Sequence, residues 1–258
     1  MAVFPFNLLS LIIVSLAMCA IGFYRYRYFL SIGRSLATAG AGLTIACLYA
    51  GLMTFPTFLL CFIICLYGLL LTAYSIYREM KMKPKEEEKL PVGPQIVIWL
   101  VASLMYVFMI LPVFYRVYNG GEFNVFTIIG LIFMIGGAGV EIVAVITRHA
   151  HRKIDADDYI KEGIYKYTRA PRYCGEFLFY AGIFISGIGG VSGIGQWLMC
   201  IIGLDFALYV VLVAAKRHEK AMDLRYTGQE GYEEYVRTTP LLIPFVPLYT
   251  LSDQKWIL

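Results

Sequence analysis

Long apolar runs separated by short polar stretches dominate the chain. Seven of these runs are long enough to cross a bilayer, which requires roughly 20 apolar residues in a helix. We expect them at residues 4–23, 35–55, 57–77, 94–115, 123–147, 174–190 and 195–215. Pro56 falls in the first turn of the third run, where the missing N–H of a proline costs nothing. The pattern predicts an all-α integral membrane protein with about seven transmembrane helices.

Basic residues lie almost entirely in alternate loops of this arrangement. Of the 22 Lys and Arg residues, only Arg116 falls outside the loops that follow the first, third, fifth and seventh runs. Positive residues stay on the cytoplasmic or matrix side of a membrane. The distribution therefore predicts the N-terminus outside and the C-terminus on the cytosolic or matrix side. The first run has no positively charged n-region, so we expect a span there rather than a cleaved signal peptide.

Composition agrees with a membrane protein. Hydrophobic residues make up 59% of the 258 residues and charged residues 16%, against about 45–50% and about 25% in soluble domains. One membrane domain, residues 1–258, accounts for the whole chain. The net charge of +4 reflects topology rather than nucleic-acid binding. If the source is eukaryotic, we expect the endoplasmic reticulum, with the mitochondrial inner membrane as the alternative.

The six cysteines lie in or beside spans without accompanying histidines, so we interpret them as packing residues and expect no metal.

Ionisable residues within the runs mark candidate chemistry, because charges are costly in lipid. Glu141 lies seven residues before Arg148, about 10 Å along a helix, and Glu176 begins the sixth run. We expect both carboxylates to reach one inner-side cavity. Asp205 lies deeper, where a functional site and a buried hydrogen bond to a neighbouring helix both remain open. Tyr67 lies near the middle of the third run, where a buried phenol can act as an acid toward a carbonyl group.

The segment 148–173 holds seven basic residues among four acidic ones. Guanidinium groups bind phosphates well, so this segment can hold a polyanion such as a dinucleotide. The alternative explanation for these basic residues is that they set the membrane topology and bind anionic lipid headgroups. The Gly-rich stretches at 136–139 and 187–190 lie within or after a span rather than after a strand. Neither is therefore a Rossmann fingerprint.

Two motifs occur in order along the chain. The first is Gly163-Ile-Tyr-Lys-Tyr-Thr-Arg-Ala-Pro-Arg-Tyr-Cys-Gly-Glu176, and the second runs from Arg217-His-Glu219 through Tyr232 to Pro244-Phe245. Together they resemble a membrane superfamily that holds steroid 5α-reductases, sterol reductases, and isoprenylcysteine and phospholipid methyltransferases. The resemblance covers about residues 60–245 and leaves residues 1–58 as variable N-terminal helices.

The reductase branch is favoured because Tyr67 through Arg78, Gly139-Val-Glu141 and Glu176 are similar to reductase segments. This resemblance implies an NADPH-dependent reduction of a C=C bond in a steroid- or lipid-like enone that enters from the bilayer. It implies catalytic roles for Tyr67, which polarises the carbonyl, and for Glu176, which holds the nicotinamide end. The implied cofactor-binding residues are Arg78, Lys81, Glu141, Arg148, Arg152, Arg169, Arg172, Tyr173, Glu176, His218 and Tyr235.

The sequence also departs from the reductase pattern. Ala170 replaces the histidine of the motif, Arg172 replaces its usual asparagine, and the second run has no carboxylate. Arg172 can either add a phosphate contact or pair with Glu176 and fill the pocket. An alternative function is therefore a catalytically degenerate structural subunit of a larger membrane complex. A third is an S-adenosylmethionine-dependent methyltransferase, while the absence of an internal repeat argues against a transporter.

Overall fold

Every regular element of the described chain is a helix. A computed structural model describes residues 2–81, 90–155, 157–252 and 254, and within these ranges no residue forms a β-strand. Within the same ranges, six helical stretches are long and apolar enough to cross a membrane, and they lie at Phe6–Phe23, Tyr26–Leu48, Phe55–Lys81, Val92–Tyr118, Val125–Ile154 and Gly193–Tyr226. The prediction of an all-α, multi-pass membrane protein is confirmed. Lys83, Lys85, Lys89 and Lys255, counted with the inner-side basic residues, lie outside the described residues.

The sixth predicted run, 174–190, forms a helix that is not among these six stretches. This helix, α6, has 17 residues, Pro171–Gly187, and is about 25 Å long at 1.5 Å per residue. That length is at the lower end of the roughly 17–25 residues that cross a bilayer. The described residues therefore hold six candidate spans and one further helix of 17 residues, near the predicted seven. The orientation of the two termini stays a prediction.

The chain divides into two compact units. The first comprises residues 1–131 and 183–204, and the second comprises residues 132–182 and 205–258. Helices α5 (Val125–Ile154), α6 and α7 (Gly193–Tyr226) each contribute residues to both units.

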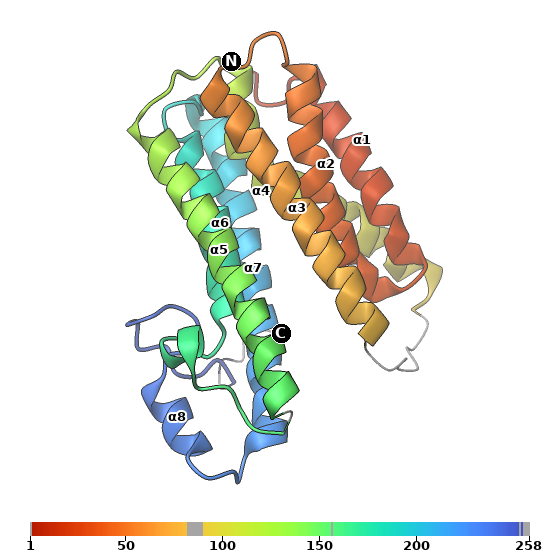
Figure 1. Ribbon diagram of the computed structural model, residues 1–258. Helices are drawn as coiled ribbons and strands as arrows, with labels where there is room; N and C mark the ends of the chain where they lie inside the picture. The colour runs from red at the N-terminus through yellow and green to blue at the C-terminus, as the bar shows by residue number, and fades with distance from the viewer. Residues whose placement is uncertain (1, 82–89, 156, 253, 255–258) are drawn as a thin grey trace. The chain divides into compact units, whose positions relative to one another are not determined.

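Small residues set the packing of the first unit. Helix α2 contacts the other three N-terminal helices (Figure 1), and the four run over Phe6–Cys19 (α1), Ile32–Leu48 (α2), Phe55–Lys81 (α3) and Val92–Tyr118 (α4). A Cβ atom on Gly68 would lie 2.4 Å from the backbone nitrogen of Ala39, and one on Gly42 would lie 2.7 Å from the carbonyl oxygen of Cys61. Glycine at these positions lets α2 and α3 approach closely, as small residues do between membrane helices.

A buried arginine joins three segments of the first unit. Arg116, near the end of α4, is 0% exposed. Its guanidinium donates to the carbonyl oxygens of Ser186, Glu122 and Ile188 and to Oδ1 of Asn124. Cβ atoms on Gly189 or Gly190 would press on Asn124 or on Arg116 itself. The glycines at 187–190 therefore serve the close packing of a helix–loop–helix connection around this side chain.

A glycine contact also organises the second unit. Gly137 of α5 and Gly175 of α6 face each other, and a Cβ atom on either would lie 2.5 Å or 2.4 Å from the carbonyl oxygen of the other. This unit also contains the 3₁₀ turn η3 (Gly163–Lys166), the short helix α8 (Tyr232–Thr238) and a segment without regular structure, residues 239–252, which we call the C-terminal strap. Helix α8 and η3 gather near the C-terminal ends of α5 and α7 (Figure 1).

Asp205 is exposed on α7. The buried residues Gly203, Ala207, Val211 and Ala215 recur every four positions and define the packed face of the helix. Asp205 is two residues from both Gly203 and Ala207, so it lies on the opposite face of the helix. Of the two alternatives left open for this carboxylate, its exposure does not support the buried hydrogen bond to a neighbouring helix.

Candidate functional site

The C-terminal part of α7 lies beyond the apolar span. The helix has 34 residues, about 51 Å at 1.5 Å per residue, whereas the hydrocarbon core of a bilayer is about 30 Å thick. Its apolar run ends at Ala215, and the next five residues are Lys216-Arg217-His218-Glu219-Lys220. Residues 216–226 therefore project into the polar region outside the span.

His218 is the centre of a basic cluster in the second unit. Burial lowers the pKa of its imidazole to about 3, and the charges of Arg148, Arg172, Arg169 and Arg152 add to the effect. Its ring centre lies 5.7 Å from that of Tyr173, and the guanidinium carbon of Arg172 lies 5.6 Å from the Tyr173 ring centre. The fold thus brings six of the predicted cofactor-binding residues together, from α5, the first motif and α7. His218 is neutral at physiological pH, so the positive charge of the cluster comes from its arginines.

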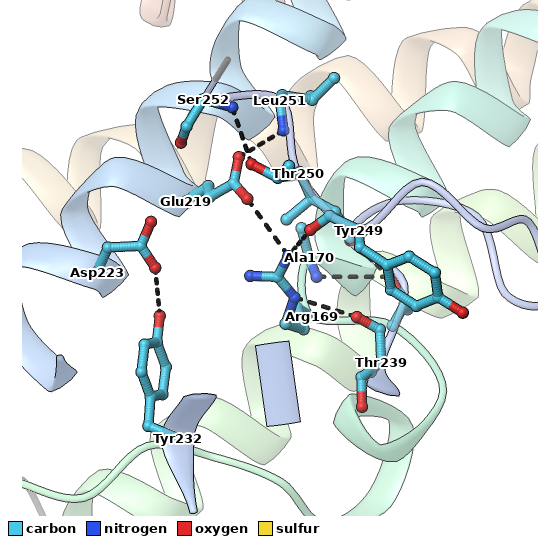
Figure 2. A network of polar contacts seen from close by, with 12 residues as sticks. Arg169, Ala170, Glu219, Asp223, Tyr232, Thr239, Tyr249, Thr250, Leu251 and Ser252 are labelled. Carbon is cyan, nitrogen blue, oxygen red and sulfur yellow. Dashed lines mark hydrogen bonds and ion pairs between the residues drawn. The ribbon is translucent and has the colours of Figure 1, made fainter. Parts of the chain in front are cut away.

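Arg169 is held by the protein itself. The side chain is 3% exposed, and its Nη2 lies 3.3 Å from Oε1 of Glu219, which is 1% exposed. Its Nε donates to the carbonyl oxygen of Thr239 at 3.1 Å, and Nη2 also donates to the carbonyl oxygen of Tyr249. The second carboxylate oxygen of Glu219 accepts the backbone N–H of Leu251 at 2.8 Å. Figure 2 shows that this buried ion pair ties both ends of the C-terminal strap to α7.

Backbone hydrogen bonds extend the connection to the first motif. The N–H groups of Arg169 and Ala170 donate to the carbonyl oxygens of Pro240 and Leu241, each at 2.9 Å. The hydroxyl of Thr168 donates to the carbonyl oxygens of Leu241 and Leu242. Ala170 is buried in an apolar cluster with Val211, Ala215, Leu241, Leu242 and Leu251. The position that holds histidine in the resembling motif therefore contributes packing in this chain.

Two buried carboxylates share the contact between α5 and α6. Glu141 and Glu176 are both buried. A Cβ atom on Gly175 would lie 2.8 Å from Cγ of Glu141, so the Glu141 side chain lies against the residue that precedes Glu176. The structure places the two carboxylates at one helix crossing. Their roles toward a cofactor stay predictions.

Tyr235 of α8 also returns to the first motif. Its buried hydroxyl donates to the carbonyl oxygen of Tyr165 at 2.8 Å, and the Tyr165 hydroxyl donates to the carbonyl oxygen of Ala144 at 3.2 Å. Burial raises the pKa of Tyr235. Tyr235 packs with Tyr159, Tyr226 and Tyr232 in an aromatic cluster. This contact chain holds α8 against η3 and α5.

Three predicted site residues belong to the first unit. Tyr67 is buried on α3, and Lys81 is exposed at the end of that helix, with Nζ 5.9 Å from the ring centre of Tyr77. Arg78 lies 3.5 Å from Glu79, which also lies 3.6 Å from Arg27. The catalytic role of Tyr67 and the phosphate contacts of Arg78 and Lys81 stay predictions.

Comparison with known proteins identifies a family. The chain matches the model of a family described as a protein of unknown function (DUF1295) over residues 32–239. It belongs to the DUF1295 family. No curated protein and no solved structure matches the chain.

The match to the DUF1295 family begins at the first residue of α2 and ends one residue after α8. It therefore contains the basic cluster around His218, both buried carboxylates at the α5–α6 contact and the Arg169–Glu219 pair. Most of the C-terminal strap follows the matched region.

Glu219 belongs to the second motif of this DUF1295 protein but is not among the residues predicted for the site. Its partner Arg169 lies 50 residues away in the sequence, so spacing gives no direct signal for the pair. Two signals in the sequence mark Glu219: its place in the second motif, and its position as an acidic residue among Lys216, Arg217, His218 and Lys220. Among the described residues, no group of three or more His, Cys, Asp or Glu side chains could hold a metal ion.

Acid should destabilise the second unit through His218. The folded-state pKa of about 3 lies below the usual value near 6.5, so the unfolded state takes up a proton first as the pH falls. The stabilisation is present above about pH 6.5 and is lost on acidification toward pH 3, by up to about 1.4 kcal/mol per pH unit. Thermal unfolding in detergent between pH 7 and pH 4 measures this slope. His218→Gln should show a shallower slope than wild type, whereas the exposed His149→Gln should keep the wild-type slope. Equal slopes for His218→Gln and wild type would contradict the prediction.

Proposed function

We propose that this protein is a membrane-embedded reductase that uses NADPH to reduce a C=C bond in a steroid- or lipid-like enone. One observation carries the proposal. Just outside the apolar span of α7, His218 lies in ring contact with Tyr173, which Arg172 covers, and the charges of Arg148 and Arg152 act on its imidazole. The resemblance of the two motifs to the reductases supports it independently.

The basic cluster suits a dinucleotide phosphate. Guanidinium groups bind phosphate oxygens in a bidentate way and stay charged at any physiological pH. NADPH carries a pyrophosphate and a 2′-phosphate, so several arginines around one point match its charge better than a single ion pair would. His218, being neutral, can donate or accept one hydrogen bond within the cluster. Arg169 would act here through its buried pair with Glu219, which positions the motif, rather than as a phosphate ligand.

The chemistry on the carbon skeleton requires a dry site. NADPH supplies the hydride when bound, and burial excludes water from that transfer. Glu176 and Glu141 are buried at the α5–α6 contact, where a carboxylate could hold the carboxamide of the nicotinamide. The proposed role of Tyr67, polarisation of the substrate carbonyl by its hydroxyl, rests on the resemblance alone.

NADPH titration of the purified full-length protein tests the proposal. Wild type should bind NADPH, and the double variant Arg148→Gln/Arg152→Gln should bind it at least about tenfold more weakly, since a tenfold change equals about 1.4 kcal/mol and charge-assisted contacts supply that much. Arg237→Gln, which removes an exposed arginine of α8, is the matched control and should bind like wild type. NADH, which lacks the 2′-phosphate, should bind more weakly than NADPH.

Other outcomes of this titration contradict the reductase. Binding of S-adenosylmethionine without NADPH would support the methyltransferase alternative. If wild type fails to bind NADPH at millimolar concentration but Arg172→Asn binds it, the pocket is filled by the protein itself. Absence of binding by both proteins would leave no support for a reductase.

A structural subunit is the second candidate function. Two positions of the first motif favour it, because Ala170 lies in an apolar cluster and Arg169 is held by Glu219 and two carbonyl groups. Motif residues that contact only the protein itself, and no ligand, are typical of a fold that has a structural role. Co-purification of the full-length chain with other membrane subunits, combined with no nucleotide binding, would favour this function over the reductase.

A further inference from the structure

The tip of the C-terminal strap, residues 243–248, presents an aromatic ring outward. Phe245 is 90% exposed, and Val246 beside it is also exposed. Phe245 has a φ of +66° and is the sole described residue other than glycine with a positive φ. This backbone region is unfavourable for residues with a Cβ atom. An unfavourable backbone conformation that keeps an aromatic ring exposed makes this residue a candidate for a contact outside the chain.

The parts of the strap that flank this tip lie at the end of the apolar spans. Leu241, Leu242 and Leu251 pack with Val211 and Ala215, which are the last turns of the apolar run of α7. Ile243 and Leu248 pack against the same cluster, as does Phe177 in the apolar part of α6. The tip is therefore at the depth where the spanning helices leave the hydrocarbon core.

The tip has few groups that require water. Its sequence, Ile-Pro-Phe-Val-Pro-Leu, contains no charged or polar side chain. Pro244 and Pro247 have no N–H, and the N–H groups of Val246 and Leu248 donate within the tip to Ile243 and Val246. Only two of its six residues can then present a backbone N–H to the surroundings. An unsatisfied N–H is the main cost of placing irregular backbone in lipid, and this tip keeps that cost low.

We propose that residues 243–248 insert into the bilayer interface and that Phe245 and Val246 contact the lipid near its glycerol and upper acyl region. Aromatic side chains are enriched at this depth of a membrane, and interfacial segments bury their apolar face about 5–10 Å below the surface. The strap is then a second attachment to the membrane after the last span. A lipid contact fits the tip better than a soluble protein partner, because the tip has no polar rim and begins where the spans end.

Tryptophan fluorescence of the full-length protein in phospholipid nanodiscs tests the proposal. In Phe245→Trp, the emission added to that of wild type should be blue-shifted. Phospholipids brominated high on the acyl chain should reduce this added emission by about twofold, as expected for a ring about 5–10 Å deep. Leu224→Trp is the matched control, because Leu224 is also 90% exposed but follows Ala215 by about 13 Å of helix. Its added emission should be red-shifted, quenched by aqueous acrylamide and unaffected by the brominated lipid.

The proposal is overturned if the tryptophan at position 245 behaves like the one at position 224. Val246→Trp gives a second position in the tip, which keeps the test decisive if Phe245→Trp does not fold. It should show the same lipid quenching. Acrylamide quenching at both tip positions without any effect of brominated lipid would place the tip in water and exclude the membrane contact. NADPH is absent from this experiment, so its outcome is independent of the proposed reductase activity.

Discussion

Replacing Arg169 with methionine should lower the free energy of unfolding of the second unit by about 3–5 kcal/mol, because removal of one partner leaves a buried charge uncompensated. The charge left behind is that of Glu219, which is 1% exposed. The variant also loses the bonds from the guanidinium to Thr239 and Tyr249. These bonds hold the C-terminal strap, so its apolar cluster with α7 should loosen as well.

A double variant separates the cost of the stranded charge from the cost of the lost side chain. Arg169→Met/Glu219→Met removes both charges and should be more stable than Arg169→Met alone, since apolar residues often replace a buried pair without loss. Asp157→Ala is the control, because its carboxylate is 97% exposed in the pair with Arg225 and exposed pairs are worth about 0–1 kcal/mol. Thermal unfolding in one detergent measures all three. If Arg169→Met unfolds at the temperature of Asp157→Ala, the buried pair does not stabilise the unit.

The helical architecture could be predicted from the sequence because it depends on local apolar runs. The runs at 57–77 and 94–115 are close to α3 and α4, which differ mainly by extra turns at their ends. The largest difference is at α7, which continues to Tyr226, well past the predicted end at 215. Hydropathy marks where a helix leaves lipid rather than where it ends, and a charged continuation remains helical when tertiary contacts stabilise it.

The basic cluster could also be predicted from the sequence, whereas the contacts that hold Arg169 and its neighbours in place could not. Charge density in 148–173 is visible in the sequence, and so is the motif that ends at Glu176. The pairing of Arg169 with Glu219 and of residues 168–170 with the strap joins segments 50 or more residues apart. Such contacts depend on tertiary packing, and no local pattern encodes them. The same holds for Ala170, whose apolar surroundings come from α7 and the strap.

Arg116 was the single exception to the one-sided distribution of basic residues, and its burial accounts for the exception. A basic residue that orients a membrane protein remains in the aqueous loop, whereas Arg116 is 0% exposed. Two of its acceptors, the carbonyl groups of Ser186 and Ile188, belong to the C-terminal end of α6 and the residue after it. A cation at the C-terminal end of a helix complements the negative end of the helix dipole. Arg116 is thus a structural group rather than a topological signal.

Arg116→Met should therefore lower the free energy of unfolding of the first unit by about 3 kcal/mol or more, because hydrogen bonds from a charged donor contribute about 1.5–3 kcal/mol each. Arg116→Lys should recover only part of this loss, since an ammonium cannot reach four acceptors arranged for a planar fork. Glu122→Ala is the matched control, because Glu122 contributes its backbone carbonyl and its side chain is exposed. It should change stability by no more than about 0.5 kcal/mol. Thermal unfolding in detergent gives the order wild type, Glu122→Ala, Arg116→Lys, Arg116→Met. If Arg116→Met is as stable as Glu122→Ala, the arginine does not hold α4, α6 and the start of α5 together.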